Sequence, residues 1–240
     1  MKKYLCGLLI LISLLAVTGS LQAQIQSVYL TRGSNAHSIH YFSPTREPAD
    51  LWLNPYLDEQ WKDGHIQFAD SIIWYGQLRY DLFRKQMEMI IESDTFYISQ
   101  PFIVDLIMIG DDYFVYSPYI DKARKEQVFG SDYFKLLSNP GPAKLLLRNR
   151  LRIEESGLAE SNLLFGMPSE QKKSFARLTT YYIQLSHEAP AIRIKRKKSH
   201  LKKLLADKWA EIEIYSKENK IRYRKVSDIA QLVDYYNTIK

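Results

Sequence analysis

The sequence predicts an α+β fold, in which an antiparallel β sheet or sandwich is followed by a small C-terminal helical subdomain. Three observations support this prediction. Apolar and polar residues alternate at residues 78–91, as they do in strands with one buried face. Short, turn-like links separate the strand candidates up to about Ile153, which favours antiparallel pairing. After Ser199 the apolar residues recur at helical spacing. Strands therefore come first and helices last, an order typical of α+β proteins.

Residues 78–91 give the clearest hairpin pattern in the chain. Leu78, Tyr80 and Leu82 alternate with polar neighbours, and the alternation returns after a polar turn at residues 84–86. Successive side chains of a strand point to opposite faces, so this pattern predicts two half-buried strands joined by a turn. We expect the residues that follow to extend the same sheet.

Turn and strand patterns on either side add to this sheet. The pair Asp63 and Gly64 predicts a hairpin turn, because Asp-Gly between apolar residues favours a tight reversal. The almost continuous apolar run at residues 102–109 predicts a central strand covered on both faces. Gly110 begins the turn after it. Proline has no backbone N–H to donate, so Pro118 is expected to end the next strand.

The C-terminal residues predict three helices. Ser199, Asp207 and Ser227 have the short polar side chains that cap helix N-termini. Asn219 lies where the second helix is expected to end. The apolar residues of the last predicted helix share one face, and they are Ile229, Leu232, Val233 and Tyr236.

The N-terminus predicts a secretory signal peptide. Lys2 and Lys3 precede an apolar run at residues 5–17, which is shorter than the roughly 20 residues of a membrane-spanning helix. Cleavage is expected after Ala23. Cys6, the single cysteine of the chain, is removed with the signal and is misplaced for lipidation. The mature protein is therefore expected to have no disulfide, thiol chemistry or cysteine metal site, and to be periplasmic or extracellular.

These patterns divide the chain into four predicted parts: a signal peptide at residues 1–23, an irregular N-terminal arm at 24–50, an antiparallel β domain at 51–190 and a basic helical C-terminal subdomain at 191–240. The charge distribution supports the last boundary. The full chain has a formal net charge of +6, yet residues 191–240 alone contain 14 Lys and Arg against 6 Asp and Glu. This distribution predicts a basic C-terminal part and a neutral or acidic remainder of the chain. No second apolar run has membrane-spanning length.

Three segments resemble a group of uncharacterised secreted proteins from Gram-negative bacteria. They are GQLRYDLFRKQMEM at residues 76–89, the aspartates before YFVY at 113–116, and LKKLLADKWAEIEIYSKENKIRYRKVSDIAQLVDYYN at 201–237. The resemblance covers residues 74–237. It implies export and a β-rich body with a basic helical C-terminus, and it implies no activity, cofactor or catalytic residue.

The strongest functional feature is a basic run at the start of the helical subdomain. Its members are Arg193, Lys195, Arg196, Lys197, Lys198, Lys202 and Lys203. Clusters of this kind bind phosphates or acidic surfaces. In an exported protein the expected partner is another protein or an anionic membrane surface rather than nucleic acid. The alternative interpretation is a solvated helix start that keeps the protein soluble.

A metal site is a weaker hypothesis. Its candidate ligands lie in the N-terminal arm, and they are His37, His40, Glu47 and Asp50. Gly33 and Pro44 argue against a helix there, and zinc usually needs three or four firm ligands. An ordinary surface loop explains these residues as well, so we assign no metal and no cofactor.

Catalytic carboxylates are a further hypothesis. Asp111 and Asp112, with Asp105 or Asp121 as a partner, resemble the paired carboxylates of glycosidases. Adjacent aspartates are also common turn formers, so we assign no catalytic residue.

The 17 tyrosines and 4 tryptophans leave two interpretations open. Exposed aromatic residues stack on sugars or contact partners, whereas residues at strand positions pack into a β core. Trp52, Trp61 and Trp74 are the residues whose exposure distinguishes the two.

Three hypotheses about function follow. The first is a non-enzymatic envelope protein that engages a protein or an anionic membrane surface through its basic C-terminus. The second is an exported hydrolase with unidentified carboxylates. The third is a module that binds a glycan or small molecule on an aromatic face.

Overall fold

The computed structural model describes residues 42–44, 54–123, 126–155 and 173–240. The chain divides into two compact units, Met1–Ser43 and Pro44–Lys240, and the description below concerns the second. A three-residue strand, β1 (Phe42–Pro44), lies at their boundary. The predicted signal peptide and most of the predicted arm fall outside the described residues. Within the described part, no helix is long and apolar enough to cross a membrane.

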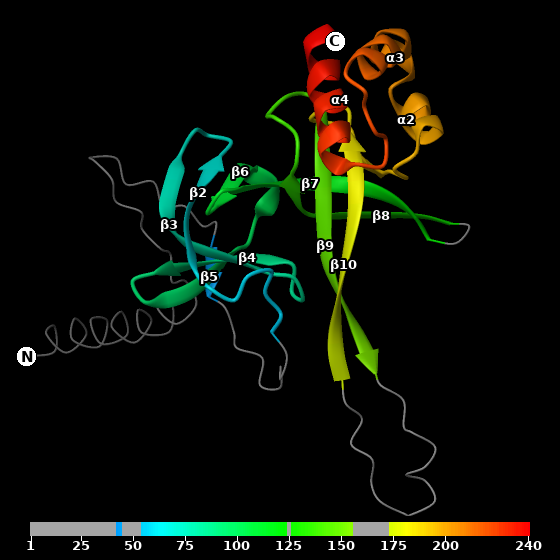
Figure 1. The fold of residues 1–240 in the computed structure, drawn as a ribbon. Helices are drawn as coiled ribbons and strands as arrows, with labels where there is room; N and C mark the ends of the chain where they lie inside the picture. The colour runs from blue at the N-terminus through cyan, green and yellow to red at the C-terminus, as the bar shows by residue number, and fades with distance from the viewer. Residues whose placement is uncertain (1–41, 45–53, 124–125, 156–172) are drawn as a thin grey trace, which may run out of the picture. The chain divides into compact units, whose positions relative to one another are not determined.

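The second unit is built on one large sheet (Figure 1). Its strands are β2 (Lys62–Phe68), β3 (Ile73–Asp81), β4 (Gln86–Ile91), β5 (Asp94–Ile98), β6 (Val104–Ile109), β7 (Asp112–Ala123), β8 (Glu126–Leu136), β9 (Lys144–Glu155), β10 (Lys173–Gln184) and β11 (Ala191–Arg193). They are hydrogen-bonded in the order β5-β4-β3-β2-β6-β7-β11-β10-β9-β8. Their pairings are antiparallel, except that β11 runs parallel to β7. Helices follow the sheet, so the predicted α+β fold is confirmed.

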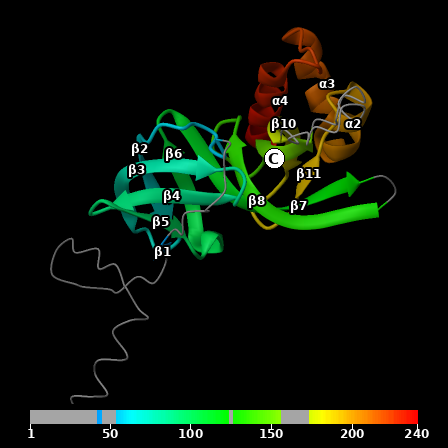
Figure 2. The same cartoon turned by 90° about the horizontal axis from the view of Figure 1, so that it is seen from below.

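The second half of the sheet closes on itself. Strand β8 pairs with β9 on one side and with β7 on the other, so β7, β11, β10, β9 and β8 form a closed ring. The side chains that fill this ring are Val115, Tyr119, Phe134, Leu136, Leu146, Tyr182 and Ala191. Strands β7 and β8 run on beyond the ring as a long hairpin, which Figure 2 shows from below. The ring gives this half of the sheet a core of its own.

The hairpin predicted at residues 78–91 is present as β3 and β4. Leu78 lies opposite Met89, and Tyr80 lies opposite Met87. All four side chains are buried, as the alternation predicts. Glu88 departs from the pattern, because it points to the other face and is nevertheless fully buried.

Three predictions about strand boundaries are wrong. Asp63 and Gly64 form no turn but lie inside β2, where Gly64 pairs with Gly76 and Ile109. Pro118 does not end β7, which continues to Ala123. Residues 102–109 are not covered on both faces, because Phe102 lies in a 3-10 helix before β6 and is 74% exposed. Tertiary pairing prevails over local turn propensity in each case.

Gly64 is required because neighbouring strands approach closely. A Cβ at this position would lie 2.0 Å from the carbonyl oxygen of Met108, a backbone atom that cannot move alone. We expect Gly64→Ala to lower the free energy of unfolding by about 3 kcal/mol, the upper range for overpacking. Urea denaturation measures it. The control is Gly110→Ala, where φ is +58° and the nearest atom is 3.4 Å away; there we expect about 1 kcal/mol. Equal losses would contradict the close-approach explanation.

The C-terminal residues form α2 (Lys198–Leu204), a 3-10 helix (Ala206–Lys208), α3 (Trp209–Glu218) and α4 (Val226–Ile239). Asn219 ends α3 as predicted. The predicted capping residues are wrong, because the residues at the cap positions are Lys197, Lys208 and Lys225, and none makes a side-chain capping hydrogen bond. These helices are therefore stabilised mainly by burial rather than by their ends.

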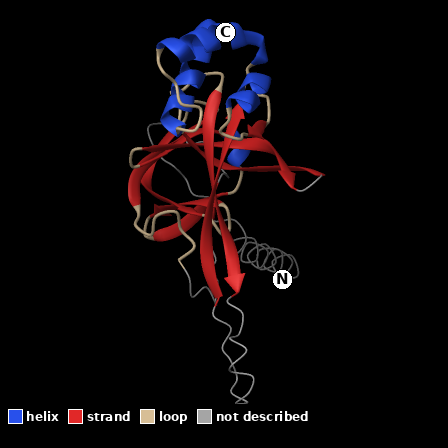
Figure 3. Ribbon diagram, turned by 45° about the vertical axis from the view of Figure 1, so that its right-hand side comes forward, coloured by secondary structure: helices blue, strands red, loops and turns tan. Residues whose placement is uncertain are grey.

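The helices lie at one end of the sheet (Figure 3), and helices and sheet share one hydrophobic core. The strands and the residues that flank them contribute Ala143, Leu145, Ile183 and Ile194. The helices and the links between them contribute Leu201, Leu205, Trp209, Ile212, Ile221, Ile229, Leu232, Val233 and Tyr236. Asn237 also exchanges two hydrogen bonds of 2.8 Å with the backbone of Ala143. The predicted boundary at residue 191 falls at the start of strand β11, which belongs to the sheet, and the core continues across it into the helices.

Candidate functional site

The predicted basic run lies on the surface between β11 and α2. The seven residues are exposed, and they are Arg193, Lys195, Arg196, Lys197, Lys198, Lys202 and Lys203. The backbone N–H of Lys195 donates a hydrogen bond to Nδ1 of His200 at 3.1 Å. This bond ties the link after β11 to α2, so the run is presented on an ordered part of the fold.

Two of the seven residues are neutralised by carboxylates. Arg193 Nη1 lies 3.1 Å from Asp121 Oδ1. Lys198 Nζ lies 2.6 Å from Glu213 Oε1 on α3. Both pairs fasten the run to the rest of the structure. They leave less free charge on it than the sequence alone indicates.

Arg196 connects the run to a second basic segment, between α3 and α4. Its Nη1 donates a hydrogen bond to the carbonyl oxygen of Arg224 at 3.2 Å. Its guanidinium also lies 5.1 Å from the centroid of the Tyr181 ring. Arg224 is exposed. The structure thus adds to the predicted site a cation that lies far from it in the sequence.

The two cations beside Arg224 share one carboxylate, that of Asp228. Its carboxylate accepts a hydrogen bond from the backbone N–H of Arg222 at 3.0 Å and lies 3.2 Å from Lys225 Nζ. The backbone hydrogen bond is the main cause that lowers the pKa of Asp228 to about 2. This carboxylate therefore stays ionised at neutral pH and offsets one of the two positive charges of Arg222 and Lys225.

The remaining cations have no such partner. Among the described residues, no carboxylate lies within ion-pair distance of Lys195, Lys197, Lys202, Lys203 or Arg224. We call these five residues, together with Arg196, the basic cluster. It is the part of the predicted run, extended by Arg224, that remains available to a partner.

The candidate catalytic carboxylates are not gathered into one site. Asp111 is exposed in the turn before β7. Asp112 pairs with Lys135 across the strands at 2.5 Å. Asp121 accepts a hydrogen bond from Tyr182 and is paired with Arg193, whereas Asp105 is exposed on β6. Each carboxylate therefore has different neighbours, and the arrangement offers no acid–base pair.

The candidate metal ligands His37, His40, Glu47 and Asp50 lie outside the described residues. In the part of the chain that the structure describes, no group of three or more His, Cys, Asp or Glu side chains is placed to hold a metal ion.

The tryptophans do not form an exposed face in the described part of the chain. Trp74 is buried and Trp61 is half-buried; Trp52 lies outside the described residues. A cross-strand row on the outer face of the sheet is more exposed, and its members are Tyr75, His65, Met108 and Tyr113. Tyr75 is 62% exposed and its ring lies 5.7 Å from that of His65. This row places the Tyr75, His65 and Tyr113 side chains on one face of the sheet.

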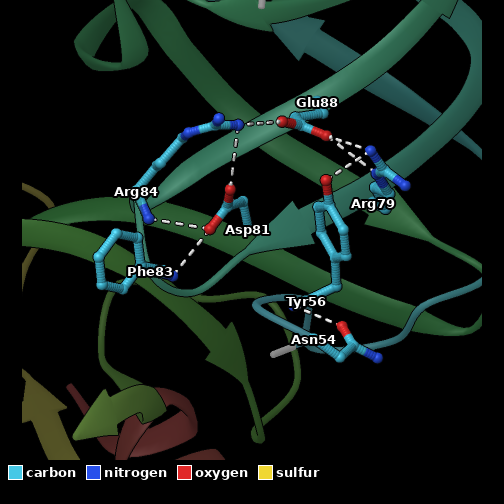
Figure 4. Close-up of polar contacts among 7 residues, drawn as sticks. All are labelled: Asn54, Tyr56, Arg79, Asp81, Phe83, Arg84 and Glu88. Atoms are coloured by element: carbon cyan, nitrogen blue, oxygen red, sulfur yellow. Dashed lines mark hydrogen bonds and ion pairs between the residues drawn. The ribbon is translucent and has the colours of Figure 1, made fainter. Parts of the chain in front are cut away.

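A cluster of charges that sequence reasoning missed joins β3, β4 and the residues before β2 (Figure 4). Arg79 donates hydrogen bonds to Glu88 at 2.9 Å and to the Tyr56 hydroxyl at 2.6 Å. Its guanidinium lies 3.7 Å and 4.0 Å from the ring centroids of Tyr56 and Trp61. Burial raises the pKa of Glu88, an effect that Arg79 opposes. Arg79 thus holds the residues before β2 against the hairpin.

Asp81 and Arg84 complete this cluster (Figure 4). The carboxylate of Asp81 accepts the backbone N–H groups of Phe83 and Arg84, both at 2.8 Å. Arg84 Nη1 lies 3.5 Å from carboxylate oxygens of Asp81 and Glu88. Each charge is matched within the protein, so the cluster fixes the turn between β3 and β4 and leaves no group for a ligand.

A second buried ion pair lies in the ring of strands. Arg148 Nε donates a hydrogen bond to Asp132 at 2.6 Å, and the Tyr80 hydroxyl donates another to the same carboxylate at 3.0 Å. The guanidinium lies 4.0 Å from the centroid of the Tyr119 ring. Burial and the charge of Asp132 raise the pKa of Tyr80 well above its usual value. The hydroxyl therefore remains a neutral donor at any ordinary pH.

A cavity of about 340 Å³ lies beside these two clusters. Its charged lining consists of Asp58, Lys62, Arg79, Asp112 and Lys135. Lys62 and Lys135 are each paired at 2.5 Å with an aspartate of the same cavity, and Arg79 is paired with Glu88. The cavity therefore has no unmatched charge with which to select a ligand.

Comparison with known proteins gives this chain no relatives: no family model, no curated protein and no solved structure matches it. The resemblance to secreted proteins of Gram-negative bacteria stays a prediction that these comparisons do not test. Any function is therefore inferred from the chain's own residues.

Proposed function

We propose that this chain is an exported, non-enzymatic envelope protein whose basic cluster binds an anionic membrane surface. The signal peptide predicted at residues 1–23 supports the export. The observation that carries the proposal is a set of lysines that have no carboxylate partner among the described residues, and they are Lys195, Lys197, Lys202 and Lys203. They are exposed, close in sequence and held on an ordered link and helix.

The expected strength of binding follows from the charge. Each basic residue close to an anionic lipid surface contributes about 1 kcal/mol, and the attraction falls off within a Debye length. Four free lysines give a substantial but salt-sensitive attraction. The core shared by α2, α3 and the sheet positions them before binding, so little additional ordering opposes association.

The residue type favours a membrane over an acidic protein. The free cations are lysines apart from Arg196 and Arg224, and Arg196 already contacts Arg224 and Tyr181. Lysine acts as a compact point charge, whereas arginine is preferred where a partner offers fixed, planar carboxylates. A fluid layer of phosphate headgroups requires no fixed geometry and therefore suits lysines.

Vesicle co-sedimentation tests the proposal. The mature chain is mixed with vesicles that contain phosphatidylglycerol, and with neutral phosphatidylcholine vesicles as a reference. In the test variant, Lys195, Lys197, Lys202 and Lys203 are each changed to Gln. We expect it to bind the anionic vesicles at least about tenfold more weakly than wild type. We also expect added salt to weaken wild-type binding.

A matched variant shows whether the position of the removed positive charges matters, or only the net charge of the protein. It has the same net charge as the test variant, but Gln replaces the exposed or half-exposed Lys62, Lys85, Lys135 and Arg152 of the sheet. We expect its binding to stay within about threefold of wild type. Equal effects of the two variants would refute a role for the basic cluster. A different result would point to a protein partner instead of a membrane. In that result, wild type binds no vesicles but binds an acidic protein, and the test variant no longer binds that protein.

A further inference from the structure

A second cavity, distinct from the basic cluster, lies where β6 and β7 meet the ends of β9 and β10. Its volume is about 290 Å³, at the lower end of the range for small-molecule sites. Its lining combines apolar residues, among them Phe102 and Pro118, with polar ones, among them Lys144, Ser131 and His187. A mainly apolar lining with a few polar groups is the usual composition of a ligand site.

Lys144 is the unusual member of this lining. It is half-buried at the first position of β9, and in the described part of the chain no carboxylate lies within ion-pair distance of its ammonium group. Burial lowers the pKa of Lys144, because the ammonium group has lost water without gaining a counter-ion. A cation in this position gains most from a ligand that brings a negative charge.

The polar lining beside Lys144 is held in place by hydrogen bonds. Gln184, its cross-strand neighbour, donates hydrogen bonds from Nε2 to the carbonyl oxygens of His187 and Ala189, at 3.1 Å and 2.8 Å. These bonds hold the loop after β10 in place at the cavity. A ligand therefore meets a preformed wall, which lowers the ordering cost of binding.

Phe102 gives the site its apolar side. The ring is 74% exposed, although it follows Pro101 in a 3-10 helix and lines a cavity. An exposed large aromatic ring that lines the same cavity as Lys144 provides a surface for an apolar group attached to an anion. Pro118 and the buried Val104 lie in the same lining and extend this surface.

We propose that this cavity binds a small organic monocarboxylate, with the carboxylate paired to Lys144 and the apolar body packed on Phe102 and Pro118. The proposal goes beyond the binding of a membrane by the basic cluster and does not depend on it. Asp105 lies in the same lining. Its negative charge opposes a doubly charged phosphate, whereas one lysine balances one carboxylate.

Binding of simple acids tests this proposal. Benzoate and hexanoate are titrated into the mature full-length protein and followed by calorimetry or by NMR, with benzamide and hexanamide as neutral analogues of the same shape. We expect saturable binding of the acids and at least about tenfold weaker binding of the amides, the loss of one charged contact. Phenyl phosphate is expected to bind no more tightly than benzoate.

Variants assign the effect to individual residues. Lys144→Met approximately keeps the length of the side chain and removes the half-buried charge. Its melting temperature should not fall below that of wild type. Its affinity for benzoate should drop at least about tenfold. Lys135→Met removes a partly exposed charge, which is paired with Asp112, from the neighbouring strand β8 and should bind benzoate like wild type. Phe102→Ala, at an exposed position, should weaken benzoate binding while leaving the fold intact.

Three results would overturn the proposal. The first is equal affinity for benzoate and benzamide, which would mean that charge plays no part. The second is a Lys144→Met variant that is folded and binds benzoate like wild type. The third is the absence of saturable binding of either acid up to about 10 mM, a concentration at which even a millimolar affinity is detected.

Discussion

Asp132→Ala is expected to lower the free energy of unfolding by about 3–5 kcal/mol, the usual cost of leaving one member of a buried ion pair alone. The substitution removes the carboxylate that accepts hydrogen bonds from Arg148 at 2.6 Å and from Tyr80 at 3.0 Å. Arg148 is 3% exposed and cannot turn its charge to water without opening the ring of strands. Urea denaturation followed by circular dichroism measures the loss.

Two further variants show whether the buried charge is the cause. Asp112→Ala removes the carboxylate of an exposed pair with Lys135 and should cost less than about 1 kcal/mol. The double variant Asp132→Leu with Arg148→Met removes both charges and should recover most of the stability lost in Asp132→Ala. If Asp132→Ala lowers the free energy of unfolding by no more than Asp112→Ala does, the buried pair of Asp132 and Arg148 does not stabilise the fold as proposed.

Leu232→Ala is expected to lower the free energy of unfolding by about 2–5 kcal/mol, the range for truncating a buried leucine. Leu232 lies on α4, is fully buried, and belongs to the core that the helices share with Leu145 and Ile183 of the sheet. Ile214→Ala on α3 is the matched control, because Ile214 is 59% exposed. It should change stability by about 0.5 kcal/mol or less.

The same Leu232→Ala variant tests whether sheet and helices unfold together. Because one core connects them, we expect a single cooperative urea transition at which the helical and the sheet signals are lost together. An early transition that removes only the helical signal would show that residues 191–240 are an independently folding part.

Local patterns explain why much of the fold could be predicted. The alternation around Leu78 and Met87 needs only a two-residue period and a short turn, so the hairpin is encoded within a few residues. The spacing of Ile229, Leu232 and Tyr236 encodes α4 in the same way. The order of strands and helices could then be predicted from the point at which helical spacing of apolar residues replaces the two-residue alternation of strands.

Features that depend on distant neighbours could not be predicted. Asp63 and Gly64 resemble a turn locally, and only the approach of Met108 shows that the glycine is needed inside a strand. The pair of Asp132 and Arg148 is formed by strands β8 and β9, and neither residue alone differs from a surface charge. The sequence pattern that could have indicated this pair is a charged residue at an inward-facing position of a strand that is otherwise apolar.

The candidate site was predictable in part. Exposure of a dense basic run follows from its composition, since lysine is rarely buried. Its free charge does not follow, because Asp121 and Glu213 come from other elements and neutralise Arg193 and Lys198. The addition of Arg224 likewise required the fold. The cavity at Lys144 has no sequence pattern, since its walls come from five separate segments.

The parallel strand β11 has a consequence for the order of folding. Ala191 pairs with Tyr119 of β7, and Ile192 and Arg193 pair with β10, so the ring of strands closes only after the chain is present to residue 193. Contacts between residues so far apart in sequence form slowly, because the loop between them must be ordered first. The ring of a nascent chain therefore stays open until residue 193 of the 240 has been made. Under the proposed export, that delay would keep the ring unlocked while the chain crosses a membrane.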